Sequence, residues 1–86
     1  MYKVLLYKQA AKYYGRLDLK IQKRINNSIN EIMKEPFNGI HIKKLKGRLG
    51  GKYRCDIGGL RMIYFVDIAN KLIYIEAIGP RGDIYQ

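Results

Sequence analysis

The chain has 86 residues, a formal net charge of +10 at pH 7 and an apolar content of 48%. A chain of this length forms one domain, residues 1–86, with one modest core, and its apolar content argues against disorder. No apolar run approaches the roughly 20 residues that cross a bilayer, so no membrane span is expected, and no signal peptide is expected before the first strand.

The charge concerns partners rather than fold. The chain has seventeen Lys and Arg residues but only seven Asp and Glu residues. This excess of positive charge favours nucleic acid or an acidic protein as partner. A membrane surface is not expected, because the basic residues do not oppose a continuous apolar helix face. The lone Cys55 cannot form an internal disulfide, which is typical of a reducing cytoplasm.

The first half of the chain predicts one strand and two helices. Residues 2–7 are expected to form a strand and residues 8–17 a short helix. Asp18 is a good N-cap for a second helix, which should end before Pro36 because the residue before proline avoids the α region. The apolar stripe of this second helix is Ile21, Ile25, Ile29, Ile32 and Met33. Both helices are expected to pack on a sheet.

Residues 37–51 are expected to form a loop with a marked cationic character. No acidic residue lies between Pro36 and Cys55. The basic residues of this stretch are Lys43, Lys44, Lys46, Arg48, Lys52 and Arg54, and the only histidine, His41, lies there too. A cationic loop beside a cationic strand is the electrostatic signature of a nucleic-acid-binding surface.

Two alternating runs, residues 53–57 and 60–64, predict a β-hairpin. Gly58-Gly59 links them, and a two-residue glycine link fixes the register. Asp56 then faces Arg61 across the hairpin. One face of the hairpin is apolar (Cys55, Ile57, Leu60, Met62 and Tyr64), and the other is polar (Lys52, Arg54, Asp56 and Arg61).

The last strand is expected over residues 72–78, after a turn at Ala69-Asn70. The predicted core-face pairs are Val66 with Ile73, Tyr64 with Ile75 and Met62 with Ala77; on the other face they are Phe65 with Tyr74, Ile63 with Glu76 and Arg61 with Ile78. The predicted fold is α+β, in the order β-α-α-β-β-β. It has a four-stranded, largely antiparallel twisted sheet and a helical hairpin on one face. The partner of strand 2–7 stays open.

Several kinds of chemistry lack their residues. One Cys and one His cannot make a zinc site, only Asp56 and Glu76 share the polar sheet face, and no phosphate-binding glycine motif is present. No metal and no cofactor are therefore expected. RNA supplies its own nucleophile, the 2′-OH, and fixed arginines can stabilise the charge that develops on the attacked phosphate.

Arg61 is held in mid-strand, and Arg81, just after the last strand, can reach the same face. A base must still remove the 2′-OH proton. Tyr85 is the first candidate, because surrounding cations would lower its pKa, and Asp56 and His41 are alternatives.

The whole chain resembles the RelE/ParE toxin superfamily. The resemblance lies in Lys44-Leu45-Lys46-Gly47, Tyr53-Arg54, Gly59-Leu60-Arg61-Met62-Ile63-Tyr64 and Ile78-Gly79-Pro80-Arg81, together with Tyr85. It implies the fold given above and a toxin of a type II toxin–antitoxin system. The implied activity is a metal-independent mRNA endoribonuclease that typically acts in the ribosomal A site, in the cytoplasm.

The resemblance also implies roles for single residues. Arg54 matches a basic RNA-binding and catalytic position, Arg61 the arginine that stabilises the phosphate, and Arg81 a catalytic basic residue. Tyr85 matches a tyrosine implicated in base catalysis or in stacking on a nucleotide. The general RNA-binding surface would comprise Lys43, Lys44, Lys46, Arg48 and Lys52.

Asp56 departs from the family pattern, which often has a second Lys or Arg there. A cross-strand ion pair that orients Arg61 is the favoured interpretation, and a general base is the alternative. The implied partners are a RelB-like antitoxin with an acidic or amphipathic segment, mRNA and the ribosome, with operator DNA bound only through the antitoxin complex. Two other functions stay open: a ParE-like inhibitor of DNA gyrase without nuclease activity, and an inactive relative that only binds antitoxin.

Overall fold

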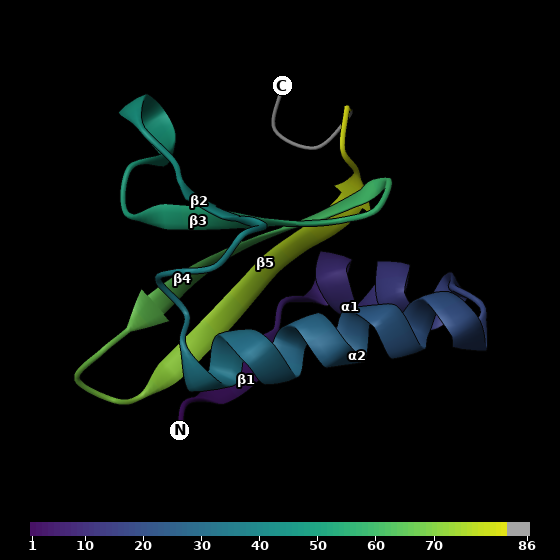
Figure 1. Cartoon of the computed structure of the whole chain (residues 1–86), viewed down its shortest axis with the longest axis horizontal. Coiled ribbons are helices and arrows are strands. Elements are labelled where there is room, and N and C mark those ends of the chain that lie inside the picture. The colour runs from purple at the N-terminus through teal and green to yellow at the C-terminus, as the bar shows by residue number, and fades with distance from the viewer. Residues whose placement is uncertain (83–86) are drawn as a thin grey trace.

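Both helices cover one face of a mixed β-sheet in the computed structural model, which describes residues 1–82 (Figure 1). The elements are β1 (Lys3–Leu6), α1 (Lys8–Arg16), α2 (Leu19–Lys34), β2 (Ile42–Lys44), a 3₁₀ turn η1 (Gly47–Leu49), β3 (Lys52–Ile57), β4 (Leu60–Asp67) and β5 (Leu72–Pro80). The predicted α+β class and helical layer are confirmed, but the sheet has five strands rather than four.

The strand order is β1-β5-β4-β3-β2. β1 runs parallel to β5, with Lys3 beside Leu72 and Leu6 beside Ile75, and the remaining neighbours are antiparallel. The last strand in sequence therefore lies inside the sheet. A parallel pair needs a long crossover, and the chain between β1 and β5 includes both helices.

The second helix begins and ends where the sequence predicts. The Asp18 carboxylate accepts a hydrogen bond from the Ile21 N–H at 2.9 Å, and the helix ends at Lys34, two residues before Pro36. Ile25 and Ile32 of its apolar stripe are fully buried. They share a core with residues from both helices and three strands, namely Ala10, Cys55, Met62, Tyr64, Ile73, Ile75 and Ile78. Neither described helix has the length and apolarity needed to cross a membrane.

The β3–β4 hairpin has the predicted register at every pair, including Asp56 with Arg61 and Cys55 with Met62. Of the two linking glycines, Gly58 adopts a positive φ of 58°, a conformation that side chains with a Cβ rarely take. The hairpin therefore places its polar side chains on the sheet face opposite the helices.

The β4–β5 register is only partly as predicted. Val66 pairs with Ile73 and Tyr64 with Ile75, which confirms the predicted start of the strand pair. A bulge then leaves Glu76 outside the ladder. As a result, the predicted pairs of Met62 with Ala77, Ile63 with Glu76 and Arg61 with Ile78 are wrong. Met62 instead pairs with Ile78, Ile63 with Ala77 and Arg61 with Gly79. The extra residue turns Ile78 into the core, where it is fully buried.

The loop predicted over residues 37–51 is wrong at residues 42–44, which form the edge strand β2. Ile42 pairs with Cys55, Lys43 with Arg54 and Lys44 with Tyr53. β2 and β3 form a second hairpin, whose connection contains η1. Strand pairing satisfies the backbone of this short segment, although its sequence alone gives only a weak strand signal.

Candidate functional site

The helices leave one face of the sheet uncovered, and we call this face the open face. It carries a group of arginines. Cys55 and Met62 are buried toward the helices, so their sequence neighbours on β3 and β4 point the other way. This puts Arg54, Asp56 and Arg61 on the open face, with Lys43 of β2 beside Arg54. The residues Arg54, Asp56, Arg61 and Arg81 are called the arginine cluster below.

An ion pair joins the two facing residues of the hairpin. Arg61 donates from Nε to Asp56 Oδ1 at 2.7 Å, and the two side chains are only 15% and 19% exposed. The predicted cross-strand pair is therefore present. Asp56 engages the inner nitrogen of the guanidinium, and within residues 1–82 the terminal amino groups of Arg61 make no hydrogen bond. Those amino groups are the part of an arginine that binds a phosphate in a bidentate manner.

The pKa of Asp56 reports the charge around it. Partial burial acts to raise this pKa, but the hydrogen bond and the positive charge of Arg61 outweigh burial and lower the pKa below its ordinary value of 3.8. The charges of Arg54 and Arg81 lower it further. Three guanidinium groups thus act on one carboxylate. A carboxylate with a lowered pKa is a weak proton acceptor, which argues for an orienting role over general-base catalysis.

Arg81 is brought to this group by the backbone. Its N–H donates to the Gly59 carbonyl at 3.0 Å, which fastens the end of β5 to the turn of the β3–β4 hairpin. The Arg81 side chain is exposed. Arg54 is half-buried, and its Nε is a buried donor without a hydrogen-bond partner among residues 1–82. Such donors cost free energy and are often found at functional sites.

Lys52, predicted to bind RNA, lies in an ion pair instead of standing alone. Its Nζ is 2.8 Å from Glu76 Oε1, and the Glu76 side chain is only 14% exposed. Glu76 is the residue that the bulge leaves out of the ladder. The sequence predicts that both residues lie on the polar face. It does not predict the bulge, and so it does not predict that the two residues pair.

The other predicted RNA-binding residues do not form one group. Lys43 lies on the open face beside Arg54, whereas Lys44 pairs with Tyr53 and points to the opposite face of the sheet. Lys46 and Arg48 are exposed at η1, in the connection that projects beyond the strands (Figure 1). The structure therefore brings Lys43 to the arginine cluster and leaves Lys44, Lys46 and Arg48 apart from it.

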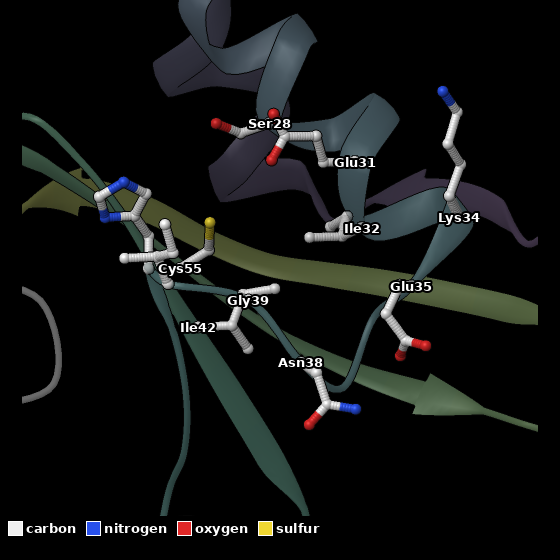
Figure 2. A pocket seen from close by; sticks show the side chains of 11 residues that line it. Ser28, Glu31, Ile32, Lys34, Glu35, Asn38, Gly39, Ile42 and Cys55 are labelled. Carbon is white, nitrogen blue, oxygen red and sulfur yellow. The ribbon is translucent and has the colours of Figure 1, made fainter.

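His41 and Cys55 line a cavity of about 420 Å³ on the helix side of the sheet. Figure 2 shows Glu31 and Ile32 reaching from α2 toward the strand that carries Cys55. His41 is exposed, and its carbonyl accepts a hydrogen bond from the Asp56 N–H at 3.0 Å, so its backbone lies beside the arginine cluster. A role for His41 as the general base stays a prediction. Burial raises the pKa of the Cys55 thiol to about 11, with smaller contributions from the negative charges of Asp56 and Glu31.

Two further predictions concern Tyr85 and metal ions. Tyr85 lies outside the described residues, so its position relative to the arginine cluster stays a prediction. Within residues 1–82, no three His, Cys, Asp or Glu side chains form a group that could hold a metal ion.

Three aromatic rings share the open face with the arginine cluster. The rings of Phe65 and Tyr74 are stacked, with centroids 4.8 Å apart and planes at 16°. Tyr7 meets both rings edge-on, at 6.3 Å and 6.0 Å. The sequence predicted the Phe65–Tyr74 pair, which is confirmed. It missed Tyr7, because the position of the first strand in the sheet was not predicted.

Comparisons with a family model and with solved structures all find toxins of toxin–antitoxin systems. A family model described as the ParE toxin of the type II toxin–antitoxin system parDE matches residues 4–85. The RelE–RelB complex of the archaeon Pyrococcus horikoshii OT3 is 30% identical, with a TM-score of 0.81, over 95% of this chain and 97% of that chain. The YoeB–YefM complex of Staphylococcus aureus is also 30% identical, with a TM-score of 0.73, over 90% of this chain and 93% of that chain.

The isolated RelE toxin of E. coli shares the fold at 19% identity, with a TM-score of 0.80, over 99% of this chain and 92% of that chain. A comparison with curated protein sequences gives no match.

Proposed function

The chain belongs to the RelE/ParE superfamily, the toxins of type II toxin–antitoxin systems, and on that premise we propose that it is an endoribonuclease that cleaves mRNA in the ribosomal A site. The observation that carries the proposal is the arginine cluster. Arg54, Arg61 and Arg81 all lower the pKa of Asp56, so their charges converge on one small region of the open face. A phosphate is the natural ligand of such a region.

The reaction follows from what RNA provides. The 2′-oxygen attacks the adjacent phosphorus, the bond to the 5′-oxygen breaks, and a 2′,3′-cyclic phosphate remains. Negative charge grows on the non-bridging oxygens as the new bond forms. Arg61 and Arg81 stabilise that charge, and they do so more strongly in the transition state than in the ground state. Arg54 and Lys43 hold the backbone on the flank of the reacting phosphate.

Two protons must move during this reaction. Tyr85 is the proposed base for the 2′-OH, or else a stacking platform for a nucleotide. Asp56 is the proposed positioning residue for Arg61, because it is ionised and already engaged at 2.7 Å. The 5′-oxygen takes up a proton as it leaves.

The proposed partners follow from family membership. The similar structures from P. horikoshii and S. aureus are complexes of a toxin with RelB or YefM. An antitoxin of that class, with an acidic or amphipathic segment, is the proposed neutralising partner of this +10 chain. Outside the arginine cluster, the proposed general RNA contacts are Lys44, Lys46, Arg48 and Lys52.

Primer extension on a reporter mRNA tests the proposal. The mRNA is analysed after brief induction of wild type, Arg61→Ala and Arg81→Ala, and of Arg16→Ala as control. Arg16 is an exposed arginine in the last turn of α1, so the control loses the same charge away from the open face. Wild type and the control should produce new 5′ ends at in-frame codons, and the other two variants should lose on the order of 10²-fold or more in cleavage rate. Purified protein with and without ribosomes, in EDTA for the ribosome-free arm, tests the ribosome and metal requirements.

The alternative function is inhibition of DNA gyrase without nuclease activity, which the description of the matching family model as a ParE toxin favours. Growth arrest with intact mRNA and inhibited supercoiling would replace the nuclease with this function. Intact mRNA with normal growth would indicate an inactive relative that only binds antitoxin.

A further inference from the structure

The aromatic rings of the open face form a patch that the core does not explain. Tyr7, Phe65 and Tyr74, with Leu5 beside Tyr74 on β1, are called the aromatic patch here. None of the four belongs to the core cluster between sheet and helices. Leu5 and Tyr7 are 49% and 43% exposed, and Phe65 and Tyr74 are half-buried. Exposed apolar surface of this kind usually marks a binding site.

The aromatic patch lies on the same sheet face as the arginine cluster, and the buried Ile63, only 1% exposed, lies between them. Phe65 follows Arg61 by four positions on β4, a separation of about 13 Å along the strand. Between them on the same face lies Ile63, which pairs with Arg54. The two groups therefore lie along one sheet face, with the cations at the Gly58-Gly59 end and the rings at the other end.

The acidic groups nearest the rings are engaged by neighbouring residues. Glu76 and Asp67 each lie two positions from a ring in sequence. The Glu76 carboxylate is 2.8 Å from Lys52 Nζ, and the Asp67 carboxylate accepts hydrogen bonds from Asn70. Lys52 in turn pairs with Phe65 across the β3–β4 ladder. Lys3, on the same face of β1 as Leu5, adds a further exposed cation at the outer side of the patch. An approaching phosphate thus meets the exposed Lys3 on one side of the rings, and on the other side Lys52 offsets the charge of Glu76.

Rings beside a cationic groove are the means by which proteins hold single-stranded nucleic acid, because every base has a face that stacks. We propose that the aromatic patch is a base-stacking platform for a nucleotide of single-stranded RNA that neighbours the one bound at the arginine cluster. This inference rests on the proposed function and extends it by a second RNA subsite. The stacked Phe65–Tyr74 pair presents a geometry that a base can continue.

A second copy of this chain fits the same surface less well. An apolar segment of a second copy would bring its own share of a +10 charge against Lys3, Lys52 and the arginine cluster. RNA brings the opposite charge together with flat apolar rings, so both features of the surface are used.

Binding of an uncleavable RNA tests the platform. The probe is a short single-stranded RNA with 2′-O-methyl groups at every position and one 2-aminopurine, whose fluorescence falls when it stacks. The variants are Tyr74→Leu and Phe65→Leu, with Tyr74→Phe as the change that keeps the ring. Tyr14→Leu is the matched control, because Tyr14 is a half-buried tyrosine on α1 whose hydroxyl donates to Asn26 on the helical side. Circular dichroism checks that each variant is folded.

Wild type, Tyr74→Phe and Tyr14→Leu should quench the probe alike. Tyr74→Leu and Phe65→Leu should lose the quenching and bind on the order of tenfold more weakly. If a variant does not fold, Tyr7→Leu replaces it, since Tyr7 is the most exposed ring of the three. Equal quenching by the leucine variants, or no binding by wild type, would overturn the platform. Sedimentation showing a wild-type dimer that the same variants dissociate would assign the patch to a second copy instead.

The readout separates this inference from the proposed function, because the methylated probe cannot be cleaved. Arg61→Ala should lose on the order of 10²-fold or more in mRNA cleavage rate, but at a protein concentration that saturates the probe it should still quench the fluorescence. Wild type that cleaves mRNA without quenching would sink the platform and leave the nuclease intact. Wild type that quenches the probe without cleaving mRNA would support the platform and overturn the proposed nuclease activity.

Discussion

Arg61 and Asp56 face each other one rung before the Gly58-Gly59 turn, and the hydrogen bond from Arg61 Nε to Asp56 Oδ1 is 2.7 Å long. Both side chains start from paired β-strands, so the contact fixes the direction of the guanidinium without using its terminal amino groups. An arginine held in this way loses little freedom when it binds a phosphate, and preorganisation of this kind is what transition-state stabilisation requires.

Replacing Asp56 by Asn should reduce cleavage modestly. The amide oxygen can still accept the hydrogen bond from Arg61, but the negative charge is lost. We expect a loss of less than about tenfold in the single-turnover rate, whereas removal of a general base would cost about 10²–10⁴-fold. A loss in the larger range, with a shifted pH–rate profile, would make Asp56 the base.

Asp56 should also stabilise the fold in a pH-dependent manner. Its pKa in the folded state is below 3.8, so its contribution is present above the unfolded value and is lost as the pH falls through the folded pKa. The difference in unfolding free energy between wild type and Asp56→Asn should therefore shrink from about pH 6 to about pH 3. The pKa of Asp67 is also lowered, by Asn70, but this carboxylate is present in both proteins and cancels. Urea titrations at several pH values measure the difference, and one that does not vary with pH would contradict the ion pair.

Cys55 should be inert in the folded protein. Burial is the main reason that its pKa rises to about 11, so almost no thiolate exists near neutral pH. A disulfide reagent should react with the thiol slowly in the native state and rapidly in urea. Cys55→Ala should keep full mRNA cleavage, with a stability loss of about 1 kcal/mol. Rapid native labelling, or loss of cleavage in a folded Cys55→Ala, would show that the thiol takes part in function.

Tyr64 should fasten the end of α2 to the sheet. The buried ring donates a hydrogen bond from its hydroxyl to the Pro36 carbonyl at 2.6 Å, and burial raises its pKa so that the proton stays in place. Tyr64→Phe should cost about 1–3 kcal/mol in unfolding free energy, because the carbonyl loses its partner.

Tyr53→Phe is the matched control for this prediction. The Tyr53 ring stacks on Tyr64 with centroids 5.7 Å apart, but within residues 1–82 its hydroxyl has no hydrogen-bond partner. Urea denaturation should therefore show a small change for Tyr53→Phe. Equal losses for the two variants would mean that the hydroxyl of Tyr64 contributes nothing specific.

The sequence predicts best where local chemistry decides the structure. Gly58-Gly59 fixes the hairpin register, and that register alone brings Asp56 to Arg61. Asp18 and Pro36 bound the second helix by capping and by steric exclusion, both of which act within a few residues.

Prediction from the sequence fails where contacts between segments that are distant in the chain determine the structure. The bulge at Glu76 improves burial of Ile78 and creates the pair with Lys52, and neither gain is visible from residues 72–78 alone. β2 is short and cationic, so it becomes a strand only because β3 offers an edge. The parallel pairing of β1 depends on a crossover through both helices, and Tyr7 joins the open face only through that pairing.

The position of β5 has a consequence for the order of folding. β5 comes last along the chain among the five described strands, yet it lies between β1 and β4, and most of the contacts of α1 with the sheet are made to it. A chain that lacks residues 72–80 has neither a neighbour for β1 nor a surface for α1. The sheet therefore cannot be completed until β5 has joined it, and Arg81 reaches its anchor on Gly59 only then.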